Sequence, residues 1–136
     1  MSVPVLIVNY DSSLRRKMRQ SLETFGYSVI EATDAESGLG TLRASKDGMV
    51  ALFNITLNRN TMTGADGVAF LGAAACDRRL ARRHGFIIIT PTPGELDAAL
   101  GRLINQLSIP ILAEPVDMEE MRQLVSEAEL RLLVSA

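Results

Sequence analysis

The sequence contains short apolar runs that each stop at a polar residue, and segments with helical spacing separate them. Four runs end in this way: Val5–Val8 before Asn9, Val50–Phe53 before Asn54, Phe86–Ile89 before Thr90, and Ile109–Ala113 before Glu114. Short apolar runs of this kind are typical of strands buried on both faces of a parallel sheet. The carboxyl ends of parallel strands meet at one edge, where open α/β sheets bind ligands. We therefore predict that Asn9, Asn54, Thr90 and Glu114 form the floor of a site.

Helical periodicity fills the intervals between the runs. After an N-cap at Asp11-Ser12-Ser13, apolar residues recur every three or four positions up to Gly26: Leu14, Met18, Leu22 and Phe25. A further strand is expected over 27–32, and Asp34 caps a second helix that ends near Ser45. Further helices are expected from Gly67 to about Arg83, over 96–107, and after Pro115, where the inner face is Met121, Leu124, Val125, Ala128 and Leu132. The chain thus repeats a strand-helix unit five times.

Five such repeats restrict the fold to few topologies. Parallel neighbours need a long crossover, and right-handed crossovers place helices on both faces of the sheet. We predict an α/β fold: a flavodoxin-like, doubly wound (βα)5 three-layer sandwich with a parallel sheet in the order 2-1-3-4-5. The length of 136 residues fits one domain spanning residues 1–136.

Composition excludes several classes of protein. The formal net charge is −2, so no general attraction to nucleic acid or to an anionic membrane is expected. No apolar stretch approaches the roughly 18 residues that cross a bilayer, and the first residues lack the pattern of a signal peptide. One cysteine, Cys76, excludes an internal disulfide and favours a reducing cytoplasm, and we expect it to be a small buried thiol. The one histidine, His84, lacks ligands at metal-binding spacing and is expected near a helix C-terminus, where positive charge is favoured.

Several segments together resemble the receiver domain of bacterial two-component response regulators, a family that includes the chemotaxis regulators. They are the opening from Val5 to Arg16, Phe25–Ala32, the Gly64-Ala65-Asp66-Gly67 turn after the third strand, and Glu114-Pro115 before an acidic helix start. The resemblance covers nearly the whole chain. It implies a role in phosphorelay signalling, in which a receiver takes a phosphoryl group from a histidine kinase.

The residues that carry this chemistry in the family are exchanged here. The resemblance implies an acid pair after the first strand and an acceptor aspartate at the end of the third, which together bind Mg²⁺. The matching positions hold Asn9, Tyr10 and Asn54. An amide is not a competent nucleophile toward phosphorus, so Asn54 cannot form an acyl phosphate. We expect Mg²⁺ binding to be weak or absent, with no cofactor.

Two further positions of the pattern differ in the same direction. The lysine expected before the proline that follows the fifth strand is Glu114, and a carboxylate there repels a phosphoryl oxygen. The aromatic switch residue of the fifth strand is Ile111, whereas the hydroxyl of Thr90 is kept. The loop after the third strand is also longer than the family pattern, and the loop after Thr90 begins with Pro91.

Some of these residues have alternative interpretations. Asp11 is either a residual acid for a metal or an N-cap. Glu114 is expected to pair with Arg59 or Arg15, because an unpaired buried carboxylate would become protonated. A lone change at Asn54 could be a substitution introduced to block phosphorylation, but Asn9, Tyr10 and Glu114 beside it argue against that.

Two surfaces are candidates for interaction with other proteins. A dense basic run extends from Arg78 to His84. Without interleaved aromatic residues it favours a solvated face or an acidic partner over nucleic acid. The resemblance implies dimerisation through the fourth helix, fifth strand and fifth helix. We expect the interaction face to include these residues: Ile111, Met121, Leu130, Leu133 and Val134.

The sequence therefore favours an atypical receiver, a pseudo-receiver, that acts by phosphorylation-independent contact with a protein such as a histidine kinase or an effector. A domain that senses a small ligand under the polar loop 56–66 is the first alternative, and a receiver from a longer regulator is the second. A phosphorylated regulator using Asp11 or Asp66 is disfavoured, because neither follows the third strand directly. An enzyme is not expected, since the sequence has no nucleophile-base pair, metal cluster or Gly-rich phosphate loop.

Overall fold

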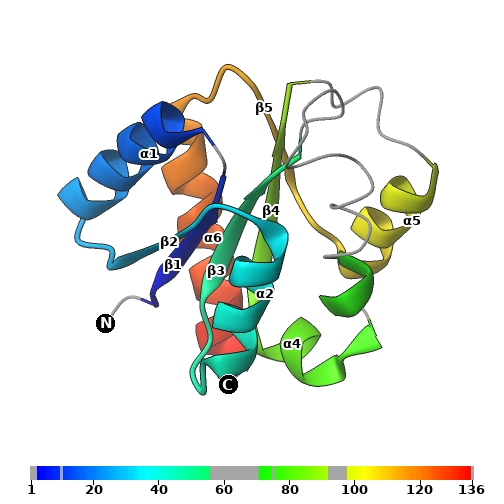
Figure 1. The fold of residues 1–136 in the computed structure, drawn as a ribbon. Helices are drawn as coiled ribbons and strands as arrows, with labels where there is room; N and C mark the ends of the chain where they lie inside the picture. The colour runs from blue at the N-terminus through cyan, green and yellow to red at the C-terminus, as the bar shows by residue number, and fades with distance from the viewer. Residues whose placement is uncertain (1–2, 10, 56–70, 75, 92–97, 136) are drawn as a thin grey trace.

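The structure is a computed structural model that describes residues 3–9, 11–55, 71–74, 76–91 and 98–135. Strands and helices alternate along the chain (Figure 1). The strands are β1 (Val5–Val8), β2 (Val29–Ala32), β3 (Val50–Asn54), β4 (Gly85–Thr90) and β5 (Ile111–Ala113). The helices are α1 (Ser12–Thr24), α2 (Ala35–Ala44), α4 (Arg78–Arg83), α5 (Ala98–Leu107) and α6 (Met118–Ser135). Residues 71–74 and 76 are also helical.

The strands form one parallel sheet in the order β2-β1-β3-β4-β5. The predicted fold class and strand order are therefore confirmed. The central strands β1, β3 and β4 are apolar up to the last residue of β3 and β4, because both faces of these strands are covered. The carboxyl ends of all the described strands lie at the same edge of this sheet (Figure 1).

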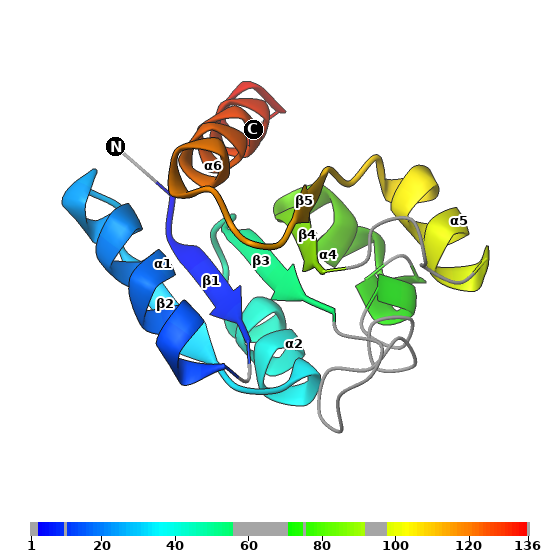
Figure 2. The ribbon, with the colours of Figure 1, turned by 90° about the horizontal axis from the view of Figure 1, so that it is seen from above.

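Two apolar cores lie on opposite faces of the sheet. Successive residues of a strand point to opposite sides, so Val5 and Ile7 belong to the core beneath α1 and α6, whereas Leu6 and Val8 belong to the core beneath α2, α4 and α5. Figure 2 shows α1 and α6 next to each other at one side of the sheet. The three layers predicted from the sequence are present.

Local sequence fixes where α1 and α2 begin. Asp11 and Asp34 have extended backbones, and their carboxylates accept hydrogen bonds from free main-chain N–H groups of the first helical turn. Gly38 lets α2 approach β1 closely: a Cβ at this position would lie 2.7 Å from Cγ2 of Val8. The helix therefore packs directly on the end of β1, next to Asn9.

The helix before β4 and the strand β5 differ most from the sequence prediction, and β2 begins at Val29 rather than at residue 27. The helix expected from Gly67 to Arg83 is broken at Asp77, because the Asp77 carboxylate accepts hydrogen bonds from the N–H groups of Arg79 and Leu80 and starts α4 anew. The strand expected from Ile109 begins only at Ile111. Pro110 has no N–H to donate, and Ser108 has a left-handed backbone with φ of 54°.

Predictions for the cysteine and the histidine also need correction. Cys76 is exposed, because it lies across its helical segment from Leu71 and Ala74, which face the core. His84 does follow the last turn of α4, but it is buried and uncharged. Its Nδ1 accepts from the Met49 N–H at 3.1 Å, its Nε2 donates to the Leu42 carbonyl at 3.0 Å, and burial lowers its pKa.

Among the described residues, no helix combines the length and apolar character that crossing a membrane requires.

Candidate functional site

The four polar residues predicted to meet do follow neighbouring strands. Asn9 comes directly after β1 and Glu114 directly after β5, whereas Asn54 and Thr90 are the last residues of β3 and β4. The strands are in register here: Val8 pairs with Phe53, Asn54 with Ile89, and Thr90 with Ala113. We call these four residues the carboxyl rim. Glu114 is tied to it directly, since its N–H donates to the Thr90 carbonyl at 3.0 Å.

Three of the four rim residues are buried. Asn9, Asn54 and Thr90 are at most 2% exposed, and Glu114 is half-buried. Two amides, one hydroxyl and one carboxylate thus occupy this edge. Among the described residues, no group of three or more histidine, cysteine or acidic side chains is arranged to hold a metal ion.

The orientation of the Asn9 amide is set by its neighbour. Its Oδ1 accepts the Asp11 main-chain N–H at 2.8 Å, which identifies the oxygen and the nitrogen of the amide. Its buried Nδ2 has no hydrogen-bond partner within the described part of the chain. The amide oxygen, the atom able to ligate a cation, is therefore already engaged, and the atom left over is a hydrogen-bond donor.

Asp11 caps a helix in this structure. One carboxylate oxygen accepts from the Ser13 and Leu14 N–H groups at 3.0 and 3.2 Å. Of the two interpretations of this residue, the structure supports N-capping, and Asp11 is exposed rather than drawn into the rim.

Arg15 supports the rim from α1, a contact that the sequence prediction missed. Its NH1 nitrogen donates to the Asn9 carbonyl at 2.7 Å, and its Nε pairs with Glu31 at 2.8 Å. Arg19 also pairs with Glu31, and its hydrogen bond is the main reason that the pKa of Glu31 is lowered. Arg15 follows Asn9 by six residues and lies in the first turn of a capped helix, a spacing that could have suggested the contact.

This arrangement bears on the predicted partners of Glu114. The ion pair that the structure gives Arg15 is with Glu31, on the neighbouring strand β2. The other predicted partner, Arg59, lies outside the described residues, as do Tyr10, Asp66 and the whole loop 56–66.

The candidate interaction face is exposed, with one exception. Ile111 is 39% exposed, Leu130 59%, Leu133 53% and Val134 83%. Met121 is fully buried in the core beneath α1 and α6, so its assignment to this face was wrong. It occupies the inner stripe of α6 with Val125 and Ala128, as its helical spacing requires.

No family model matches the sequence, and no curated protein matches it significantly. Solved structures do match. A receiver domain protein described as CheY-like, from Methanospirillum hungatei, superposes with a TM-score of 0.78 at 21% identity and covers 100% of both chains. The signal receiver domain of an HD domain-containing protein from Pseudomonas fluorescens gives 0.73 at 20% identity, covering 98% of this chain and 99% of that one.

A third similar structure is the signal receiver domain of a modulated diguanylate cyclase from Desulfovibrio desulfuricans, with a TM-score of 0.72 at 22% identity. It is covered over 99% of its length, and this chain over 98%. Such likeness over whole chains shows that this protein has the fold of response regulator receiver domains.

Proposed function

We propose that this chain is a receiver domain of two-component signalling that has lost phosphoryl chemistry and acts through contact with a protein partner. The observation that carries the proposal is Asn54. It ends β3 as a buried amide, at the position where the resemblance to receivers implies the acceptor aspartate. An amide nitrogen or oxygen cannot form the acyl phosphate on which the family's signalling depends.

The remaining rim residues support the same proposal. Glu114 places a carboxylate where the family pattern has a lysine, and at about 4 Å with an effective dielectric near 20 each such interaction is worth about 4 kcal/mol. Attraction of a phosphoryl oxygen becomes repulsion. Asn9 has its oxygen engaged by Asp11, so it offers little to Mg²⁺. The proposal therefore includes neither catalysis nor a metal cofactor.

The partner is a protein of the signalling pathway, such as a histidine kinase or an effector. The apolar residues exposed on β5 and the end of α6, with α5 beside them, also suit a twofold contact with a second copy. Sedimentation at several protein concentrations tests that contact.

The free, exposed Cys76 is compatible with the reducing cytoplasm in which such pathways operate.

A small ligand bound at the carboxyl rim is a second candidate function. The observation that favours it is the buried Asn9 Nδ2, a donor that lacks a partner among the described residues. Leaving such a donor unsatisfied costs about 1–3 kcal/mol, which an acceptor atom of a ligand would recover.

Treatment with Mg²⁺ and acetyl phosphate, followed by intact mass measurement, tests the main proposal. We expect no adduct on the natural sequence, and no thermal stabilisation with beryllofluoride. The matched control carries Asn9→Asp, Tyr10→Asp, Asn54→Asp and Glu114→Lys, and we expect it to gain one phosphoryl group. A stoichiometric adduct on the natural sequence would overturn the proposal. An unmodified control would show that these four positions do not account for the loss.

A further inference from the structure

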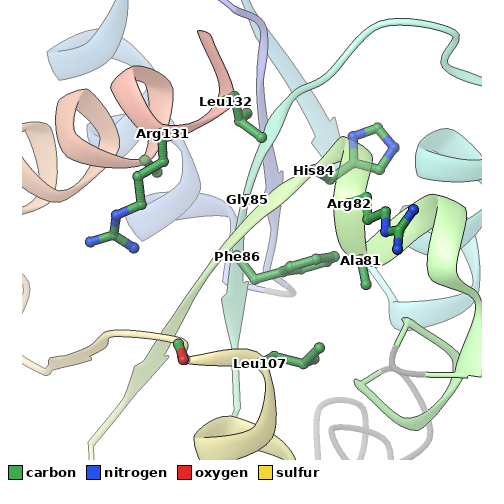
Figure 3. Close-up of a pocket in the computed structure, with 10 residues that line it drawn as sticks. Ala81, Arg82, His84, Gly85, Phe86, Leu107, Arg131 and Leu132 are labelled. Carbon is green, nitrogen blue, oxygen red and sulfur yellow. The ribbon is translucent and has the colours of Figure 1, made fainter. Parts of the chain in front are cut away.

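A pocket of about 410 Å³ lies at the amino end of the sheet, opposite the carboxyl rim. It opens where the last turns of α4, α5 and α6 converge on the start of β4 (Figure 3). β5 begins only opposite Ile88, so the first residues of β4 extend beyond it. We call this space the amino-end pocket. Its volume is in the range of small-molecule sites, about 300–1,000 Å³.

The floor of the amino-end pocket is apolar. Phe86 lies at its centre, with Leu107 and Leu132 at its edges (Figure 3). Gly85 contributes no side chain; a Cβ there would lie 3.4 Å from Cβ of Ala128 and would fill part of the space. The floor is thus suited to a flat apolar group.

Two cations flank this floor, and none of the described residues that line the pocket is acidic. Arg82 comes from α4 and Arg131 from α6, on opposite sides of Phe86 (Figure 3). In the described part of the chain neither guanidinium has an ion pair or a side-chain hydrogen bond. Other arginines are engaged: Arg83 donates to the Ser45 carbonyl at 2.7 Å, and Arg122 to the Ser21 hydroxyl at 2.6 Å.

The helix ends around the pocket oppose an anion, and the two formal positive charges of Arg82 and Arg131 have to outweigh them. The C-termini of helices carry partial negative charge, about half an elementary charge each at most. The chain satisfies part of it, since the carbonyls of Leu80 and Ile104 accept the N–H groups of His84 and Ile109 at 3.1 and 3.0 Å. His84 also lines the pocket, but its imidazole points away from Phe86 (Figure 3), and both ring nitrogens are bonded to main chain, so the ring is not available to a ligand.

We propose that the amino-end pocket binds a small organic anion with a flat apolar body, such as an aromatic carboxylate. The ring contacts the apolar lining of Phe86, Leu107 and Leu132. The carboxylate accepts hydrogen bonds from Arg82 and from Arg131 after the Arg131 side chain, whose guanidinium points away from Phe86 in Figure 3, turns inward. The site is separate from the carboxyl rim and does not depend on the function proposed for it.

Titration of the ¹⁵N-labelled chain with 2-naphthoate, followed by NMR, tests this proposal. We expect saturable shifts of the amides of Gly85, Phe86 and Ser108. The neutral analogue 2-naphthylmethanol has the same ring without the charge, and it should bind about tenfold more weakly. Absence of saturable shifts at the pocket, or equal affinity for the two probes, would overturn the proposal.

Substitutions separate recognition of charge from recognition of shape. Arg82→Gln and Arg131→Gln should each weaken naphthoate binding by about tenfold while leaving naphthylmethanol unaffected. Arg102→Gln, on the exposed surface of α5 and outside the pocket, is the matched control.

Ala81→Leu fills the pocket from α4 and should weaken the binding of both probes. Asn54→Asp, at the opposite end of the sheet, should leave both affinities unchanged. If Arg82→Gln and Arg131→Gln bind naphthoate as tightly as Arg102→Gln does, the roles assigned to Arg82 and Arg131 are wrong.

Discussion

The two ends of the sheet differ in how fully a buried polar side chain is hydrogen-bonded. At the amino end, His84 uses both ring nitrogens, one toward Met49 and one toward Leu42, and so joins α4, α2 and the start of β3. At the carboxyl end, Asn9 uses its oxygen, and its nitrogen has no partner in the described chain. Both side chains are at most 3% exposed. A fully satisfied group fixes structure, whereas a half-satisfied one leaves capacity for a ligand or a water molecule.

The comparison predicts that His84 carries more stability than Asn9. His84→Phe keeps a planar ring but leaves the Met49 N–H buried without its partner, and the Leu42 carbonyl keeps only its longer hydrogen bond from the Ser45 N–H, at 3.4 Å. We expect a loss of about 2–4 kcal/mol in the free energy of unfolding, measured with urea. His84→Gln can both donate and accept, and it should recover part of this loss. A His84→Phe protein as stable as the natural one would mean that water replaces both bonds.

The same histidine should make stability depend on pH. Its pKa in the folded state is lowered by burial and, to a smaller degree, by the charge of Arg83. The unfolded chain therefore binds the proton more readily. Stability from this group is complete above the unfolded pKa of about 6.5 and falls as the pH drops from there toward the lower folded value.

The slope from one group cannot exceed about 1.4 kcal/mol per pH unit. Urea midpoints between pH 7.5 and 5 measure it. His84→Phe should abolish the dependence of stability on pH near pH 6. The loss of stability at lower pH that comes from Glu31 and Asp34, whose pKa values are lowered in the folded state, should remain. An unchanged slope in His84→Phe would assign the effect to other groups.

Of these changes, Asn9→Ala should reduce the free energy of unfolding least. It removes the acceptor for the Asp11 N–H, but Asp11 is exposed and water can take that place. It also removes a buried donor without a described partner. We expect a loss of about 1 kcal/mol or less in urea unfolding. Asn105→Ala, on the exposed side of α5, is the control, and a loss as large as that of His84→Phe would remove the contrast between the two ends.

The sequence predicted the sheet well and its polar contacts poorly. Apolar runs and helical spacing depend on local pattern, so strand order and the meeting of Asn9, Asn54, Thr90 and Glu114 at one edge could be predicted. The break at Asp77 and the late start of β5 depended on one capping carboxylate and on Pro110, which compete with periodicity. Bonds between distant segments, such as His84 to Met49, leave no signal in spacing, so the neutral state of His84 was not foreseen.

The assignment of Met121 failed for a different reason. Its position on the inner stripe of α6 was predicted correctly, and only the attempt to place it on the outer face contradicted that periodicity. Leu130, Leu133 and Val134 lie off the stripe and are exposed, as the same rule requires.

The outermost strands of the sheet limit how this protein can associate with others. β5 has three residues, with Pro110 before it and Pro115 just beyond it, and β2 has four, with the charged Glu31 among them. Short edge strands that carry a charged residue or are flanked by proline are poor templates for the addition of another strand. Copies of this chain should therefore resist joining sheet to sheet into fibres. Any partner that docks beside β5 has to do so with side chains rather than by extending the sheet.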